Sequence, residues 1–271
     1  MRVVLVSQVP AAAHGMTELL RPLGHEPVAL LCSREPADRY GGFAQHVQNA
    51  PAGLDVVIPA ARDRIAPLFR TYEPDLVLCV GFPWKIPRDA LAVPKLGVVN
   101  GHPSLLPRYR GPSPMSWAIR KGETEVGFTF HRMDEDLDTG NLLGQARIVL
   151  GDEHSWEELE PSLIPAIEGV FPQVLERIER GDSGDPQSEA DASYYSFFEP
   201  EYVRIDWTRS RDDIHRQVRS WRFASAHGDQ GALTELDGEE VRVLRVSLEP
   251  ADGRAVECGD GTLWIVESEP A

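Results

Sequence analysis

Several signatures of common protein classes are missing from this 271-residue chain. It has three cysteines and no C-x-x-C pair, so neither a zinc site nor a disulfide framework is indicated, and no metal is expected. No apolar run reaches the length of about 18 residues that a transmembrane helix needs. The glycine-rich dinucleotide fingerprint and the Walker A sequence do not occur either, so NAD and ATP are poorly supported as ligands.

The N-terminus gives no sign of a secretory signal peptide. Residues 1–7 turn polar too soon for an apolar signal segment and instead predict a first strand. With no membrane segment and no disulfide pattern, we expect a cytoplasmic location and no membrane partner.

Positive charge is also scarce. The formal net charge is −16, from 27 basic and 43 acidic residues, and lysine occurs only as Lys85, Lys95 and Lys121. Residues 182–271 hold 9 basic and 20 acidic residues, which gives that segment a net charge of −11. Because nucleic-acid binding depends on clustered lysine and arginine, a nucleic-acid partner is not expected for this part of the chain. A general gain in solubility would explain the acidity equally well.

What the chain does have is a regular alternation of short apolar runs and helical patterns. Helices are expected over 15–23, 64–72 and 156–180, the last with a kink at Pro172. Strands are expected at 3–6, 28–31, 56–59, 76–80, 98–100, 126–131 and 146–150. Continuous Val/Leu runs separated by helices are typical of parallel strands covered on both faces. The pattern predicts an α/β fold: a Rossmann-like, mostly parallel sheet with helices on both faces.

A polar, Gly- and Pro-containing stretch over 181–192 separates a smaller second unit. There a helix is expected at 211–222, strands at 241–246 and 263–266, and a hairpin turn at Cys258–Gly261. This predicts a small C-terminal helix-and-β domain, OB-like but shortened. The expected boundaries are 1–182 for the first domain, 183–203 for the linker and 204–271 for the second domain.

Three polar residues with acid–base potential follow two of the predicted strands. Asn100 and His102 stand at the end of one strand, and Asp138 follows a later one. Ligands of open parallel sheets bind beyond the carboxyl ends of the strands. A histidine there can move a proton, an asparagine amide can donate to a developing oxyanion, and an aspartate can orient the imidazole. By itself His102 fits a turn cap as well, and His with Asp also fits a metal site.

The ordered set of motifs resembles the formyltransferases that use 10-formyltetrahydrofolate, in the branch of the methionyl-tRNA and sugar N-formyltransferases. Asn100, His102 and Asp138 match the family triad, while SLLP at 104–107 with Arg110-Gly111, and DTG at 138–140, match its signature loops. The resemblance spans about residues 1–182 and resumes more faintly at 204–207 and 215–217. It implies an enzyme that takes 10-formyltetrahydrofolate as formyl donor, with Asn100, His102 and Asp138 as catalytic residues.

The resemblance also implies where the pterin of the donor lies. One wall would be the segment 81–87, with Phe82, Trp84, Lys85 and Ile86 as binding residues. The other would be 133–138, with Asp134 and Asp136 among the binding groups. Flat apolar side chains suit a heterocycle, although a hydrophobic turn packed on the core would have the same composition.

For the acceptor, the resemblance points to the signature loop, with Ser104, Arg110 and Gly111. Aromatic residues crowd the linker, and we expect Tyr194 and Tyr195 to wall a small-molecule pocket; stapling the two domains together is an equal alternative. The loop 33–52 lacks the dense basic cluster that a tRNA enzyme would need.

The resulting expectation is N-formyl transfer to a primary amine of a small molecule, either a nucleotide-linked amino sugar or an amino-acid-derived precursor. Methionyl-tRNA formylation is the alternative, disfavoured by charge and length. A non-catalytic folate-binding protein is the second alternative. A homodimer is left open.

Overall fold

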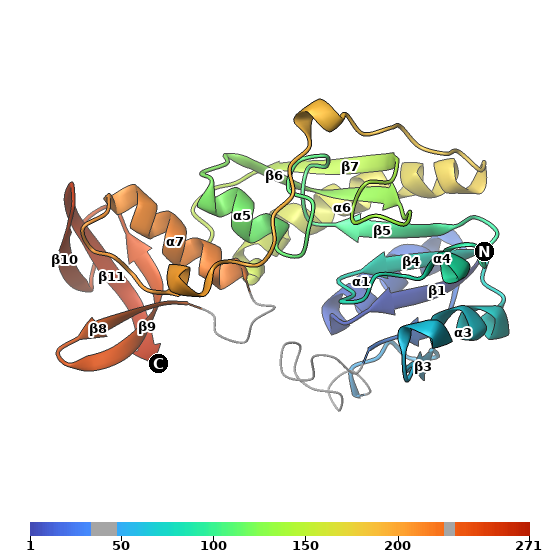
Figure 1. Cartoon of the computed structure of the whole chain (residues 1–271), viewed down its shortest axis with the longest axis horizontal. Helices are drawn as coiled ribbons and strands as arrows, with labels where there is room; N and C mark the ends of the chain where they lie inside the picture. The colour runs from blue at the N-terminus through green and yellow to red at the C-terminus, as the bar shows by residue number, and fades with distance from the viewer. Residues whose placement is uncertain (34–47, 225–230) are drawn as a thin grey trace. The chain divides into compact units, whose positions relative to one another are not determined.

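The structure, a computed structural model, describes residues 1–33, 48–224 and 231–271 (Figure 1). Most of the loop 33–52, whose lack of a dense basic cluster was used to argue about the acceptor, therefore falls outside the described residues. Within the described ranges, no helix combines the length and the apolar character needed to cross a membrane.

The first part of the fold is a seven-stranded sheet in the order β3-β2-β1-β4-β5-β6-β7 (Figure 1). Its strands are β1 (Arg2–Ser7), β2 (Glu26–Leu31), β3 (Asp55–Val57), β4 (Leu76–Val80), β5 (Val98–His102), β6 (Glu125–Arg132) and β7 (Leu142–Val149). The pairs β1–β2, β1–β4, β2–β3 and β4–β5 are parallel, whereas β5–β6 is antiparallel. The expectation of a mostly parallel sheet is confirmed.

Helices connect these strands. They are α1 (Pro10–Leu20), α3 (Ile65–Tyr72), α4 (Arg88–Leu91), α5 (Pro114–Arg120) and α6 (Trp156–Glu179), with short 3₁₀ turns η1 (Arg21–Leu23) and η2 (Arg62–Arg64). The long helix expected at 156–180 is present, and it continues past Pro172 without ending there.

The core explains why the central strands are apolar on both faces. Val4 and Val6 of β1 pack in one cluster with Phe69 of α3 and Ala90 of α4. The alternate residues Val3 and Leu5 point to the other face of the pleat and are also fully buried. Because both faces of the sheet are covered along Val3–Val6, the middle of β1 is continuously apolar.

The C-terminal elements form a second, antiparallel sheet in the order β10-β11-β9-β8, with α7 packed against it. The elements are η4 (Pro200–Val203), α7 (Arg211–Phe223), β8 (Ala232–Leu236), β9 (Glu239–Ser247), β10 (Arg254–Cys258) and β11 (Gly261–Pro270); the 3₁₀ turn η3 (Glu189–Asp191) precedes them in the connection after α6. Ser210 is the N-cap residue of α7, and its hydroxyl accepts a hydrogen bond from the backbone N–H of Asp213 at 3.2 Å. The expected hairpin turn joins Cys258 to Gly261.

The chain forms two compact units, each assembled from separate stretches of sequence. Unit 1 comprises 1–110, 127–147 and 163–193, and unit 2 comprises 111–126, 148–162 and 194–271. The two are described separately below.

Candidate functional site

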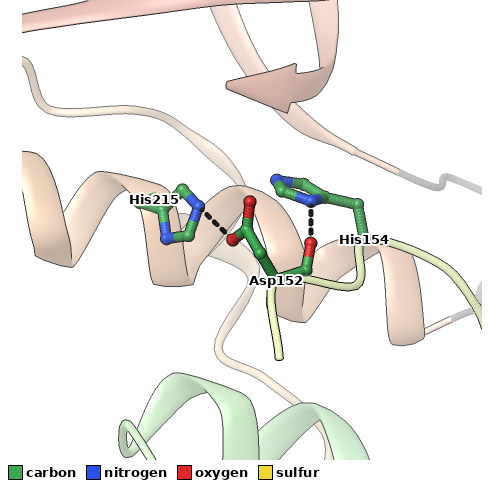
Figure 2. A group of neighbouring side chains, drawn as sticks. All are labelled: Asp152, His154 and His215. Carbon is green, nitrogen blue, oxygen red and sulfur yellow. Dashed lines mark hydrogen bonds and ion pairs between the residues drawn. The ribbon is translucent and has the colours of Figure 1, made fainter. Parts of the chain in front are cut away.

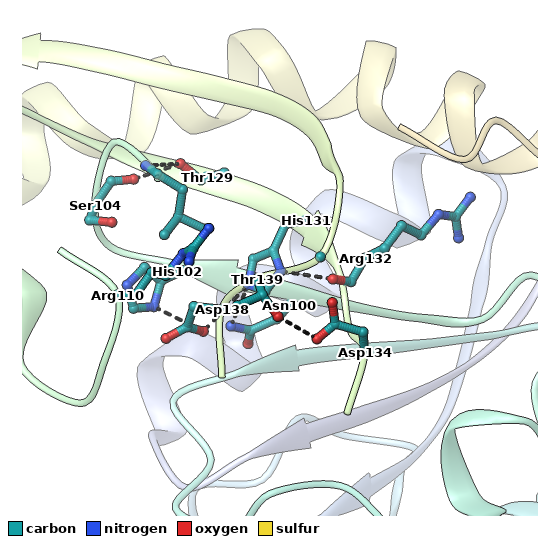
Figure 3. A network of polar contacts seen from close by, with 12 residues as sticks. Asn100, His102, Ser104, Arg110, Thr129, His131, Arg132, Asp134, Asp138 and Thr139 are labelled. Atoms are coloured by element: carbon teal, nitrogen blue, oxygen red, sulfur yellow. Dashed lines mark hydrogen bonds and ion pairs between the residues drawn. The ribbon is translucent and has the colours of Figure 1, made fainter. Parts of the chain in front are cut away.

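The polar cluster lies in unit 1, at the carboxyl end of β5 (Figure 3). Asn100 and His102 belong to β5 itself, and Asp138 follows β6 in a left-handed backbone conformation with φ 58°. Between the first two stands Gly101, where an added Cβ would come within 2.6 Å of the Phe128 ring. Packing therefore requires glycine at the point where the strand delivers its two polar side chains.

His102 lies between Asp138 and a backbone carbonyl. Its Nε2 is 2.9 Å from the carbonyl oxygen of Tyr109, so Nε2 carries a proton and donates it. Its Nδ1 is 3.6 Å from Oδ1 of Asp138, which is longer than a direct hydrogen bond. The imidazole is therefore fixed on one side, while Nδ1, facing a carboxylate, retains its ability to accept a proton.

A fourth polar residue, His131 of β6, completes the cluster. Its Nε2 is 3.1 Å from Nδ2 of Asn100 and 3.5 Å from Oδ1 of Asp138. Its Nδ1 donates to the carbonyl of Arg132 at 2.8 Å, so in the neutral ring Nε2 accepts from the Asn100 amide. This contact orients the amide and uses only one of its two N–H groups. Sequence reasoning missed His131, although it is the cross-strand partner of Asn100 in the β5–β6 register.

The surroundings of His102 favour its neutral form. Burial lowers the pKa of His102 below its ordinary value of 6.5, and the nearby His131 lowers it further. The Asp138 charge and the bond to the Tyr109 carbonyl act in the opposite direction without overcoming burial. At neutral pH the imidazole is therefore ready to receive a proton.

This pKa has a consequence for the pH dependence of the reaction. If neutral His102 accepts a proton, kcat/KM should rise with pH along a limb whose apparent pKa lies below 6.5 and then level off. Because the Asp138 charge raises that pKa, Asp138→Asn should move the limb to lower pH as well as slow the reaction. Rate profiles of both proteins between acidic and neutral pH check this. A limb that stays in place in Asp138→Asn would assign the titration to another group.

The two segments expected to enclose the donor meet in unit 1. Lys85 Nζ is 3.6 Å from Oδ1 of Asp136, and Arg88 Nε is 2.9 Å from Oε1 of Glu135. Asp134, which is exposed, accepts hydrogen bonds from the Thr139 hydroxyl at 2.7 Å and from the Asp136 N–H at 3.0 Å. The adjacent carboxylates are thus paired or held by local bonds, with their side chains at the surface.

The apolar residues of the first segment have different positions. Phe82 and Trp84 are half-buried, with ring centroids 5.9 Å apart in an edge-to-face arrangement. Ile86 is 2% exposed and belongs to the core beneath them. Only Phe82 and Trp84 therefore offer flat surfaces to a heterocycle, and Ile86 supports them from below.

Two of the signature-loop residues expected to bind the acceptor have structural partners. The Ser104 hydroxyl donates to the carbonyl of Arg108 at 2.9 Å. The buried Arg110 guanidinium donates to Gln187 Oε1 at 2.9 Å and to both carboxylate oxygens of Glu189, at 2.8 and 3.2 Å. An acceptor could engage Arg110 only by displacing these groups.

The segment after α6 contributes more than a connection. Gln187 also donates through Nε2 to the carbonyls of Asp138 and Gly140, both at 2.8 Å. It therefore links Arg110 to the loop that carries Asp138. The polar composition of 181–192 predicted only a linker. The hydrogen bonds of Gln187 hold this segment in place, and they join residues far apart in the sequence that no local pattern connects.

The remaining expected residues lie in unit 2. Gly111 has φ +110°, and a Cβ there would be 2.1 Å from the carbonyl oxygen of Tyr195. The Tyr195 ring stacks on Trp117 at 4.5 Å, whereas Tyr194 is 55% exposed. Tyr195 thus packs within its own unit, and Tyr194 keeps a free surface.

Comparison with known proteins supports what the geometry indicates. Residues 6–175 match the family model described as formyl transferase, and residues 198–271 match that of its C-terminal domain. The chain belongs to the formyl transferase family. This formyltransferase therefore transfers formyl groups, and the family's use of formyltetrahydrofolate confirms the expected donor class.

Curated relatives match 90% or more of the length of this formyltransferase. It is 32% identical over 257 residues to the methionyl-tRNA formyltransferase of Synechococcus sp. (strain JA-2-3B'a(2-13)), covering 90% of this chain and 77% of that protein. It is 29% identical over 297 residues to the enzyme of the same name from Marinobacter nauticus, covering 99% of this chain and 91% of the relative.

Solved structures share the fold. HypX from Aquifex aeolicus, in complex with tetrahydrofolic acid, matches with a TM-score of 0.71 at 20% identity; the match covers all of this chain but only 44% of HypX. WlaRD, a sugar 3N-formyl transferase solved in the presence of dTDP and 5-N-formyl-THF, has a TM-score of 0.69 at 18% identity, covering 99% of this chain and 97% of WlaRD. At these identities the likeness concerns architecture alone.

Proposed function

We propose that this formyltransferase moves the formyl group of 10-formyltetrahydrofolate to the α-amino group of methionyl-tRNA. The observation that carries the acceptor is the likeness to curated methionyl-tRNA formyltransferases, which extends over 90% of the chain. The small-molecule acceptor expected from the charge is not confirmed, and the comparisons favour what was the alternative.

In the proposed reaction the neutral amine attacks the formyl carbon, which forms a C–N bond and a tetrahedral oxyanion. The N–H of Asn100 that His131 does not use donates to this oxyanion. Nδ1 of His102 takes the proton that the amine loses, and Asp138 stabilises the resulting imidazolium. Collapse breaks the bond between the formyl carbon and the folate nitrogen, which receives the proton. Atoms and charge therefore balance without any further reactant.

The half-buried rings of Phe82 and Trp84 would hold the pterin of the donor against the 133–138 segment. The ion pairs Lys85–Asp136 and Arg88–Glu135 would keep this wall in place. Apolar surface with a few polar groups at its edge is the usual composition of a site for a flat heterocycle.

A small primary amine is the second candidate acceptor, and one observation favours it. Seven of the nine arginines in 182–271 are within 4.0 Å of a carboxylate. Any phosphate contact would have to compete with a carboxylate already in place, in a segment whose net charge is −11. The arginines of this segment therefore offer little unpaired positive charge to a tRNA.

The decisive experiment presents both kinds of acceptor to the purified protein with 10-formyltetrahydrofolate. For the main proposal, we expect turnover on charged initiator methionyl-tRNA that weakens steeply as salt is raised. Efficient turnover on an amino sugar or amino acid, with none on the tRNA, would replace it by the second candidate. Calorimetry with the unreactive mimic 5-formyltetrahydrofolate serves as control, because binding of the mimic shows that the donor site is intact.

A further inference from the structure

A second cluster of ionisable side chains lies in unit 2, outside the chemistry described above. Asp152 and His154 belong to the connection between β7 and α6, and His215 projects from α7 (Figure 2). One ligand atom from each of the three residues lies within 4.8 Å of the others. The sequence did not predict this group, because His215 is far from the other two along the chain and no metal motif links them.

One atom of the cluster is buried without a partner. His154 is 2% exposed, and its Nδ1 donates to the backbone carbonyl of Asp152 at 2.8 Å. That bond leaves the lone pair on Nε2, which has no hydrogen-bond partner among the described residues. A buried polar atom without a partner costs free energy, so its retention needs an explanation.

The other two groups complete a ligand set. Nε2 of His215 is 2.9 Å from Oδ1 of Asp152, and His215 is buried while the Asp152 side chain is 69% exposed. Four-coordinate zinc with bonds of about 2.0–2.1 Å holds its ligand atoms roughly 3.4 Å apart. Ligand atoms that lie within 4.8 Å of one another would therefore have to approach by at most about 1.4 Å when a metal ion binds.

The local charge suits a cation. Arg219 and Arg245 lie near the cluster, with Arg219 Nε 3.9 Å from Asp152 Oδ1. Arg219 is held by the carbonyls of Gly151 and Glu153, and Arg245 is paired with Glu158. The carboxylates around the two histidines are Asp152, Glu153, Glu158 and Asp212, so acids outnumber the two guanidinium groups.

We propose that Asp152, His154 and His215 form a binding site for a divalent transition-metal ion of the zinc class, with Nε2 of His154 as its buried ligand. Two imidazoles and one carboxylate are a ligand set that such ions favour, and solvent would occupy the remaining position. Binding displaces the proton of the nitrogen that His215 contributes. The ion would tie the β7–α6 connection to α7 within unit 2 and would take no part in formyl transfer.

The test uses full-length protein stripped of metal by a chelator and titrated with Co²⁺, whose visible absorption reports four-coordinate binding. We expect one equivalent to bind at micromolar concentration, and Zn²⁺ to displace it. A hundredfold excess of Zn²⁺ over its Kd should raise the midpoint of thermal unfolding by about 5 °C. Saturation that requires millimolar metal, or an unchanged unfolding midpoint, would overturn the proposal.

Variants can distinguish metal binding at this site from metal binding at the other pair of neighbouring histidines, His102 and His131. Asp152→Asn changes an exposed side chain and His215→Asn a buried one, and each should weaken metal binding by at least about tenfold. His102→Asn is the matched control, because it removes the imidazole that faces Asp138 and should leave the stoichiometry unchanged. The proposal fails if His102→Asn abolishes binding while Asp152→Asn retains it. Circular dichroism of each variant verifies folding, and Asp152→Asn alone suffices if His215→Asn does not fold.

Discussion

His102→Ala should lower kcat/KM for formyl transfer by about 10²- to 10⁴-fold, the usual contribution of a positioned acid–base group. The size of the effect follows from the position of the ring. Its Nε2 is fixed by the Tyr109 carbonyl, and its Nδ1 faces Asp138 at 3.6 Å. Among the described residues, the other imidazole near Asp138 is that of His131. Its Nε2 accepts a hydrogen bond from the Asn100 amide, so it cannot replace His102 as the proton acceptor.

Loss of folding must be separated from loss of chemistry in this variant. Removing the imidazole deletes its hydrogen bond to the Tyr109 carbonyl, and the loss of such a bond costs about 0.5–1.5 kcal/mol of stability. Thermal unfolding and binding of 5-formyltetrahydrofolate should therefore be measured beside the rate. His14→Ala is the matched control, because His14 is exposed and bonds only the Asn49 carbonyl in the described structure. A folded His102→Ala protein that keeps near-normal kcat/KM would contradict the proposed role.

The sequence was a good guide to the central sheet for a physical reason. Strands buried on both faces must be continuously apolar, so β4 was predicted with its observed bounds, Leu76–Val80. The edges of the fold lack that signal. Strands β8 and β10 were missed because charged residues such as Glu235 and Arg254 interrupt them at exposed positions. Helix α5 was missed because its seven residues are nearly all buried and show no polar face.

The same distinction applies to the residues of the functional site: some are visible in a local sequence pattern, and others depend on long-range contacts. The end of an apolar strand is visible in a sequence, and so Asn100 and His102 could be placed together without coordinates. His131 depends on the register of the antiparallel β5–β6 pair, and Gln187 on the path of a polar connection. Both are long-range pairings that no local pattern encodes. Arg110 was expected to contact the acceptor because of the signature loop, and its partners Gln187 and Glu189 in that same connection are likewise invisible to a local pattern.

Asn100→Ala should lower kcat by about 10²- to 10³-fold, the effect of removing one oxyanion donor. One N–H of the Asn100 amide is occupied by Nε2 of His131, 3.1 Å away, which fixes the direction of the other. Because that second N–H finds its partner only when the oxyanion forms, its loss should reduce kcat and kcat/KM equally and leave KM nearly unchanged.

Asn49→Ala provides the matched control for this variant, since Asn49 is exposed and contacts His14 through its backbone carbonyl, which the substitution keeps. The truncation at Asn100 also removes the donor to His131, so the His131 ring gains freedom to turn toward Asp138, 3.5 Å away. Such a turn would change the position of the His131 ring relative to His102, whose pKa His131 lowers, and would move the acidic limb of the rate profile. A fall in kcat with an unmoved limb therefore identifies loss of the oxyanion contact itself. A fall in kcat/KM that comes entirely from a raised KM would show instead that Asn100 binds the ground state, and the oxyanion role would have to be abandoned.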